Sequence, residues 1–111
     1  MCVSLHFNGS RSKQAQGSEV LYAAGSVRGR ELAEAIQSAQ VRVLQLPDRG
    51  LKAIARKGRG GRVLWETQMP CVIVEPVFGS NARGWAQYRD RRAAWIAALA
   101  DAIVEVGGVP C

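Results

Sequence analysis

The chain has 111 residues, of which 48% are hydrophobic, and this size and composition fit one globular domain with a modest core. Its 15 basic and 9 acidic residues give a net charge of +6, which favours a polyanionic partner: nucleic acid, an acidic membrane surface or an anionic cell-wall polymer. No apolar run approaches the roughly 18 residues that span a bilayer. No basic and then apolar leader follows Met1 either. We therefore expect a soluble single domain without a membrane span or signal peptide.

The first residues alternate between apolar and polar side chains. Residues 3–8 (VSLHFN) have the period of a strand with two different faces. The protein's only histidine, His6, stands near the end of this strand. The polar residues 9–16, which contain Gly and Ser, predict a loop.

Residues 17–23 (GSEVLYA) predict a second strand, with residues 20 and 22 on one side and residues 19 and 21 on the other. Ser26 is a suitable N-cap for an amphipathic helix that follows. The apolar stripe of this helix consists of Val27, Leu32, Ala35, Ile36, Ala39 and Val43. Pro47 bounds the next segment.

Residues 48–62 are basic and end in several glycines, which predicts a loop with one helical turn at 51–57. The segment 63–67 (VLWET) is short enough to be either extended or helical. Six cations gather within fourteen residues of this loop, namely Arg49, Lys52, Arg56, Lys57, Arg59 and Arg62. The positive charge of the protein is therefore concentrated locally.

In residues 71–78 (CVIVEPVF), a nearly continuous apolar run bounded by Pro70 and Pro76 predicts a strand buried on both faces, as in parallel α/β sheets. Within it, Cys71 is most simply a small buried hydrophobic residue. The three cysteines show neither a CxxC pair nor zinc-finger spacing.

A long helix is expected at the carboxyl end, capped by Asn81 and ended by Gly107 and Gly108, with Pro110 beyond. Its apolar stripe consists of Trp85, Tyr88, Trp95, Ile96, Leu99, Ala102, Ile103 and Val106. Strands and helices in this order predict an α/β fold with a twisted, mostly parallel sheet flanked by helices.

Two residues stand where open α/β sheets bind ligands, which is beyond the carboxyl ends of the strands. These are His6 and Glu75. A carboxylate that ends an apolar strand needs a cation, a metal-bound water or solvent nearby, and a raised pKa there would suit general acid–base chemistry. A hydrogen-bonded structural histidine and a solvated or ion-paired glutamate are the alternatives, and two such residues do not establish a metal site.

Four segments in order resemble the zinc-dependent N-acetylmuramoyl-L-alanine amidases of the amidase_3 family. They are VSLHFNGS (3–10), QGSEVLY (16–22), RGLK (49–52) and LWETQMPCVIVEPVFGSN (64–81). The most specific are the S-L-H-F-N strand end and the block in which an apolar strand delivers a glutamate before F-x-S-N. The resemblance covers nearly the whole chain and implies an amidase_3-like α/β fold.

The resemblance also implies a reaction and its residues. Such amidases hold Zn²⁺ with two histidines and a glutamate, and a further glutamate acts as general base and acid. By this resemblance His6 is a zinc ligand and Glu75 is the catalytic residue. The reaction is hydrolysis of the amide bond between N-acetylmuramic acid and L-alanine. The expected partner is peptidoglycan, and the expected location of the parent enzyme is the periplasm or cell wall.

The family's first zinc-ligand motif, of the D-x-G-H-G type, and its glutamate ligand precede the S-x-H-x-N strand, whereas this sequence starts within that strand. We therefore expect residues 1–111 to form a partial, amino-terminally truncated amidase_3-like catalytic domain with an incomplete zinc site. We also expect weak zinc binding and an open sheet edge. A non-catalytic peptidoglycan-binding module is the alternative function. A small basic nucleic-acid binder, suggested by KGRGGR at 57–62, is the least favoured one.

Overall fold

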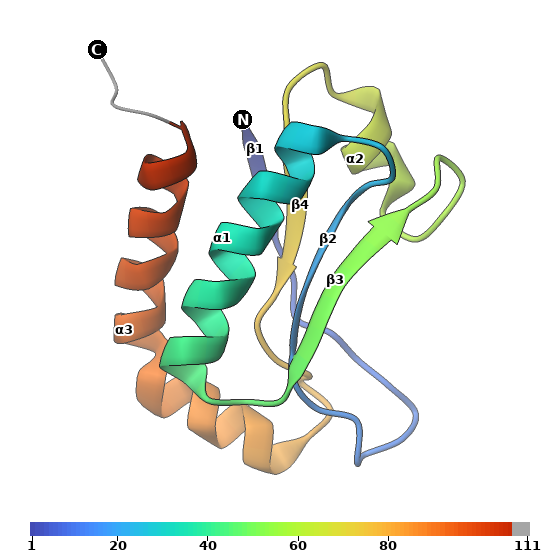
Figure 1. The fold of residues 1–111 in the computed structure, drawn as a ribbon. Coiled ribbons are helices and arrows are strands. Elements are labelled where there is room, and N and C mark those ends of the chain that lie inside the picture. The colour runs from blue at the N-terminus through green and yellow to red at the C-terminus, as the bar shows by residue number, and fades with distance from the viewer. Residues whose placement is uncertain (108–111) are drawn as a thin grey trace.

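The computed structural model describes residues 1–107, which form one four-stranded sheet and three helices (Figure 1). In chain order the elements are β1 (Cys2–Leu5), β2 (Ser18–Ala23), α1 (Val27–Leu44), β3 (Asp48–Ile54), α2 (Gly61–Glu66), β4 (Cys71–Glu75) and α3 (Ala82–Gly107). The predicted α/β class is confirmed.

The strands lie in the order β1-β4-β2-β3. β1 pairs with β4 and β2 pairs with β3 in parallel, whereas the central pair, β2 and β4, is antiparallel. The sheet is therefore mostly parallel, as predicted, but one half of it runs opposite to the other. In the central pair, Glu19 is the register partner of Glu75.

Helices cover both faces of the sheet. α1 and α3 lie side by side over one face, where they pack on Val20, Val72 and Val74 (Figure 1). α2 covers the other face, where Leu64 packs on Leu21 and Ile73. The alternation of side chains along β2 and β4 thus feeds two hydrophobic clusters, and burial of the apolar side chains in both clusters is the main force that holds the layers together.

The predicted helix caps are confirmed. The Ser26 side chain accepts a hydrogen bond from the backbone N–H of Gly29 at 3.0 Å, and the Asn81 side chain accepts one from Gly84 at 2.7 Å. Each cap satisfies a backbone donor that the first helical turn leaves without a partner. α3 reaches Gly107, and the predicted stop signals at residues 108 and 110 lie outside the described residues.

The prediction for residues 48–62 is wrong in its first half. Residues 48–54 form strand β3 instead of a loop with a helical turn, because they pair with β2 along its length. β3 is an outer strand with partly exposed residues, so its polar side chains cost little there. The ambiguous segment that follows is mostly helical, as α2.

Two residues correct the predicted helix stripes, and a third agrees with the predicted sheet edge. Val27 and Ile96 were placed on buried helix stripes but are 72% and 50% exposed. β1 is an outer strand, and Leu5 on it is 55% exposed, which agrees with the expected open apolar edge. Within residues 1–107, none of the helices is both long and apolar enough to cross a membrane.

Candidate functional site

Because the central pair is antiparallel, the carboxyl ends of two strands and the amino ends of the other two lie together along one edge of the sheet. This edge runs across the strand ends. The carboxyl ends of β1 and β4 place His6 and Glu75 there. The amino ends of β2 and β3 place Glu19 and Arg49 at the same edge, because these two strands run the opposite way. The two residues singled out in the sequence therefore do lie on neighbouring strand ends.

His6 is exposed and is held by two hydrogen bonds. Its backbone N–H donates to the Val74 carbonyl at 3.0 Å, which continues the β1–β4 ladder. Its Nε2 lies 2.9 Å from the Ser4 hydroxyl oxygen. Because Val74 immediately precedes Glu75, His6 and Glu75 occupy adjacent places at this edge. Within residues 1–107 no hydrogen bond joins their side chains.

Glu75 is only 5% exposed, and its two carboxylate oxygens differ. Oε1 lies 3.4 Å from Nη2 of Arg59, whereas Oε2 is buried and has no hydrogen-bond partner among residues 1–107. Burial raises the pKa of Glu75 above its ordinary value. The negative charge of Glu19 also raises this pKa, and the positive charge of Arg59 opposes the rise without cancelling it.

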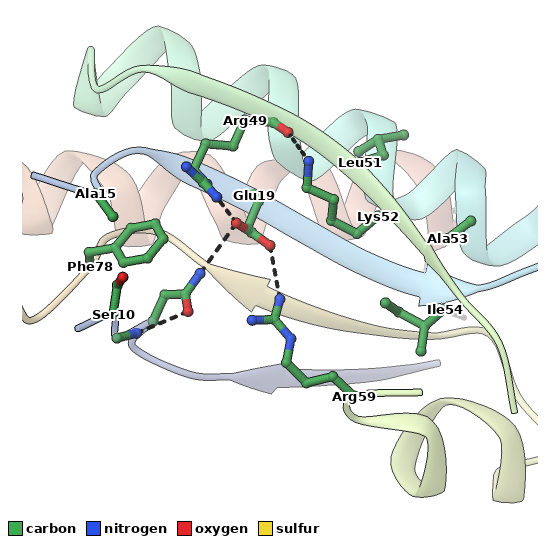
Figure 2. A pocket seen from close by; sticks show the side chains of 12 residues that line it. Ser10, Ala15, Glu19, Arg49, Leu51, Lys52, Ala53, Ile54, Arg59 and Phe78 are labelled. Carbon is green, nitrogen blue, oxygen red and sulfur yellow. Dashed lines mark hydrogen bonds and ion pairs between the residues drawn. The ribbon is translucent and has the colours of Figure 1, made fainter. Parts of the chain in front are cut away.

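Glu19 is a second buried carboxylate beside Glu75 and is 2% exposed (Figure 2). Its Oε1 accepts hydrogen bonds from Nε of Arg49 at 2.8 Å and from Nδ2 of Asn8 at 3.2 Å. Its Oε2 accepts one from Nη2 of Arg59 at 3.0 Å. Three donors from three distant segments therefore converge on one carboxylate, which offsets the cost of burying it.

Arg59 links the two carboxylates through a single nitrogen atom. It comes from the turn before α2, where Gly60 has a φ of 73° that disfavours other residues. A side chain at Gly60 would also meet the Cδ1 atom of Ile73 on β4. The glycine thus lets the turn approach the sheet closely enough for Arg59 to reach it.

Four residues of this site were not predicted from the sequence as site residues, namely Glu19, Arg49, Arg59 and Asn8. One signal was available: Glu19 shares a strand face with the apolar Leu21, so a buried charge in need of cations could have been inferred. In addition, three arginines of the basic segment contact other side chains of the protein. Arg49 and Arg59 pair with Glu19, and the guanidinium of Arg56 lies 4.9 Å from the Trp65 ring centre.

The zinc that the resemblance implies can be tested against the donors at this edge. Within residues 1–107, no group of three or more His, Cys, Asp or Glu side chains is placed to hold a metal ion. Glu19 is occupied by its three donors, and His6 supplies one imidazole. The described residues therefore do not by themselves fit a zinc site.

Comparison with known proteins identifies the family. A sequence profile of the amidase_3 family, described as N-acetylmuramoyl-L-alanine amidase, matches residues 1–105. A search of curated proteins found no match.

Solved structures of amidases are similar over almost all of this chain. The catalytic domain of the amidase CwlV from Bacillus (Paenibacillus) polymyxa has 28% identity and a TM-score of 0.81, covering 97% of this chain and 57% of that chain. A putative amidase from Neisseria meningitidis has 26% identity and a TM-score of 0.72, with 95% and 57% covered. AmiC2 of Nostoc punctiforme has 25% identity and a TM-score of 0.74, with 93% and 55% covered. This chain thus spans just over half the length of these relatives. It belongs to the N-acetylmuramoyl-L-alanine amidase family.

Proposed function

We propose that this chain takes part in hydrolysis of the amide bond between N-acetylmuramic acid and L-alanine in peptidoglycan. The observation that carries the proposal is the Glu75 carboxylate, which is buried at the strand-end edge with its Oε2 atom unpartnered among residues 1–107. A carboxylate with a raised pKa and a free oxygen is suited to accept and return a proton. Family membership supplies the bond class on which it acts.

In this proposal Glu75 takes one proton from the attacking water, and the water oxygen bonds to the carbonyl carbon of the scissile amide. The carbon–nitrogen bond then breaks, and Glu75 passes the proton to the L-alanine nitrogen, which leaves as an amine. Arg59 holds Oε1 in an ion pair, so Oε2 is the atom placed for the transfer. The positive charge of Arg59 opposes the rise in the pKa of Glu75 and so favours its ionised form.

The proposal includes Zn²⁺ as the cofactor and His6 as one of its ligands. Its other ligands would have to come from outside residues 1–107, because these residues contain no suitable cluster. Peptidoglycan as the substrate also places the enzyme's site of action at the cell wall.

The test measures the release of amino groups from purified peptidoglycan, with L-alanine identified as the new amino-terminal residue. Two proteins are compared with added zinc: the 111-residue chain, and the chain extended by its in-frame upstream coding sequence. We expect release by the extended protein. Glu75→Gln should reduce the rate by about a hundredfold or more, because it removes the proton acceptor. Glu66→Gln, which alters an exposed glutamate, should not change it.

Unchanged activity of the Glu75→Gln variant would refute the assignment of Glu75. Binding of both proteins to insoluble peptidoglycan without any amine release, with or without chelator, would instead indicate the non-catalytic binding module. A steeply salt-dependent affinity for nucleic acid without affinity for peptidoglycan would indicate the nucleic-acid binder.

A further inference from the structure

A cavity of about 610 Å³ opens beside Glu19 (Figure 2). Its lining includes the cationic side chains Arg49, Lys52 and Arg59 and a single carboxylate, Glu19. That carboxylate is already bound by Arg49, Arg59 and Asn8. The cavity therefore carries surplus positive charge, which attracts an anion.

Arg49 is held in one orientation by groups on two sides. Its Nε donates to Glu19 at 2.8 Å, and its guanidinium carbon lies 4.8 Å from the centre of the Phe78 ring. Phe78 is itself fixed beside Asn8 by an isolated bridge between the two segments. Within residues 1–107, no hydrogen bond is made by the two Nη atoms of Arg49. A guanidinium ordered in this way loses little conformational freedom when it binds a ligand.

Lys52 adds a second donor on the same strand. Its Nζ donates to the backbone carbonyl of Arg49 at 2.7 Å, which uses one of its three N–H groups. The planar fork of Arg49 and the ammonium group of Lys52 both match a carboxylate, which accepts two parallel hydrogen bonds from a guanidinium. Apolar side chains, Leu51 and Ile54 among them, complete the lining and suit a peptide with short side chains.

The cavity is connected to the proposed catalytic residue through Arg59. This side chain lines the cavity and also lies 3.4 Å from Oε1 of Glu75. A substrate cut at Glu75 would therefore place the chain that continues from the broken bond close to the cavity. The peptide part of peptidoglycan continues beyond L-alanine with a D-glutamyl residue whose α-carboxylate is free.

We propose that the cavity binds a free carboxylate of the peptide part of the substrate, through the two Nη atoms of Arg49 with Lys52 beside them. Glu19 acts here as a positioning residue, because it holds Arg49 by Nε and leaves its outer edge to the ligand. The identity of the peptide rests on the proposed function. The carboxylate preference rests on the cavity itself.

The test is a binding titration followed by nuclear magnetic resonance, using the 111-residue chain at about 0.15 M ionic strength. The first probe is L-alanyl-γ-D-glutamyl-L-lysine amide, which has a free carboxylate on its D-glutamyl residue. The second probe is the same peptide with that carboxylate converted to a carboxamide. We expect saturable shifts of the Gly9, Ser10 and Lys52 amides with the first probe, and affinity about tenfold or more lower for the second.

Two matched variants separate the Arg49 fork from charge in general. Arg49→Lys keeps the charge that Glu19 needs but removes the fork, so the carboxylate peptide should bind about tenfold more weakly and the carboxamide peptide should be unaffected. Arg62→Lys makes the same change at a side chain that is 91% exposed and does not line the cavity. It should leave both affinities unchanged. Thermal unfolding of each variant shows whether the fold is intact.

Equal affinity for the two peptides, absence of binding, or equal weakening of both peptides by Arg49→Lys would overturn the proposal. So would equal displacement of the peptide by inorganic phosphate at the same concentration, because the site would then select charge alone. The titration needs no hydrolysis. Carboxylate-selective binding with no amine release from peptidoglycan would therefore support the carboxylate site and count against the proposed function. Amine release without carboxylate-selective binding would support the proposed function and count against the carboxylate site.

Discussion

Replacement of Arg59 by methionine removes the one side chain that touches both buried carboxylates. Its Nη2 lies 3.0 Å from Glu19 Oε2 and 3.4 Å from Glu75 Oε1. In the variant, Glu19 Oε1 keeps Arg49 and Asn8 as partners, whereas Glu19 Oε2 keeps no hydrogen bond within residues 1–107. Glu75 keeps no ion pair within residues 1–107. The loss therefore falls on both carboxylates: Glu19 Oε2 loses its hydrogen-bond donor, and Glu75 loses its ion pair when it is ionised.

The expected cost follows from these contacts. A hydrogen bond to a charged group contributes about 1.5–3 kcal/mol to stability. The Arg59 side chain is 56% exposed, so solvent screens part of its attraction and the lower half of that range applies. We expect Arg59→Met to lower the free energy of unfolding by about 2 kcal/mol at pH 8, which corresponds to about 10 °C in melting temperature.

The cost should depend on pH with a definite sign. Arg59 lowers the pKa of Glu75, so its removal makes ionisation of Glu75 harder. When Glu75 is protonated, little of this attraction remains to be lost. The cost of Arg59→Met should therefore be smaller at pH 4 than at pH 8, and it should grow as pH rises through the raised pKa of Glu75.

The assay is urea unfolding followed by tryptophan fluorescence at both pH values, for Arg59→Met, Glu75→Gln and the double variant. We expect the cost of Arg59→Met to fall by about 1 kcal/mol when Glu75 is already glutamine, because the two residues interact directly. Arg62→Met, which removes a cation whose partner is exposed, is the control and should change little. Strictly additive effects, or equal costs at pH 4 and pH 8, would show that Arg59 does not stabilise the Glu75 carboxylate.

Three further variants or treatments probe the same region. Burial raises the pKa of Glu75, so the wild-type protein loses stability as pH rises above the ordinary pKa of a glutamate. The stability of Glu75→Gln relative to the wild type, measured by thermal unfolding, should therefore be higher at pH 7 than at pH 4. A difference between the two proteins that does not depend on pH would contradict this. Burial raises the pKa of Cys71 to about 12, so iodoacetamide at pH 8 should modify Cys71 far more slowly in the native chain than in urea, as read by peptide mass spectrometry. Gly60→Ala should cost more stability than Gly25→Ala, since both glycines have positive φ but only the first would press a methyl group on Ile73; equal costs would mean that the turn can move away.

Local sequence patterns predicted most of the elements. Helices α1 and α3 followed from apolar periodicity and from the caps Ser26 and Asn81, and β4 followed from its continuous apolar run. β3 could not be predicted in this way, because Arg49, Gly50 and Lys52 break the strand pattern. Its strand form depends on pairing with β2, which is a long-range contact.

The sequence could predict only those site residues that lie at the carboxyl ends of parallel strands. His6 and Glu75 met that condition because β1 and β4 are parallel neighbours. In an all-parallel sheet, Glu19 at the start of β2 would lie at the opposite edge from Glu75. The structure reverses β2 relative to β4, so Glu19 becomes the register partner of Glu75.

This reversal explains why a cluster of cations is needed at that edge. Two carboxylates opposite each other on the same face repel, and burial increases the repulsion. Because β3 is parallel to β2, the same reversal brings Arg49 to this edge from the start of β3. The glycine-rich turn before α2 brings Arg59. Arg49 and Arg59, two arginines of the basic segment that suggested a nucleic-acid partner in the sequence, are therefore the counter-charge of Glu19 and Glu75.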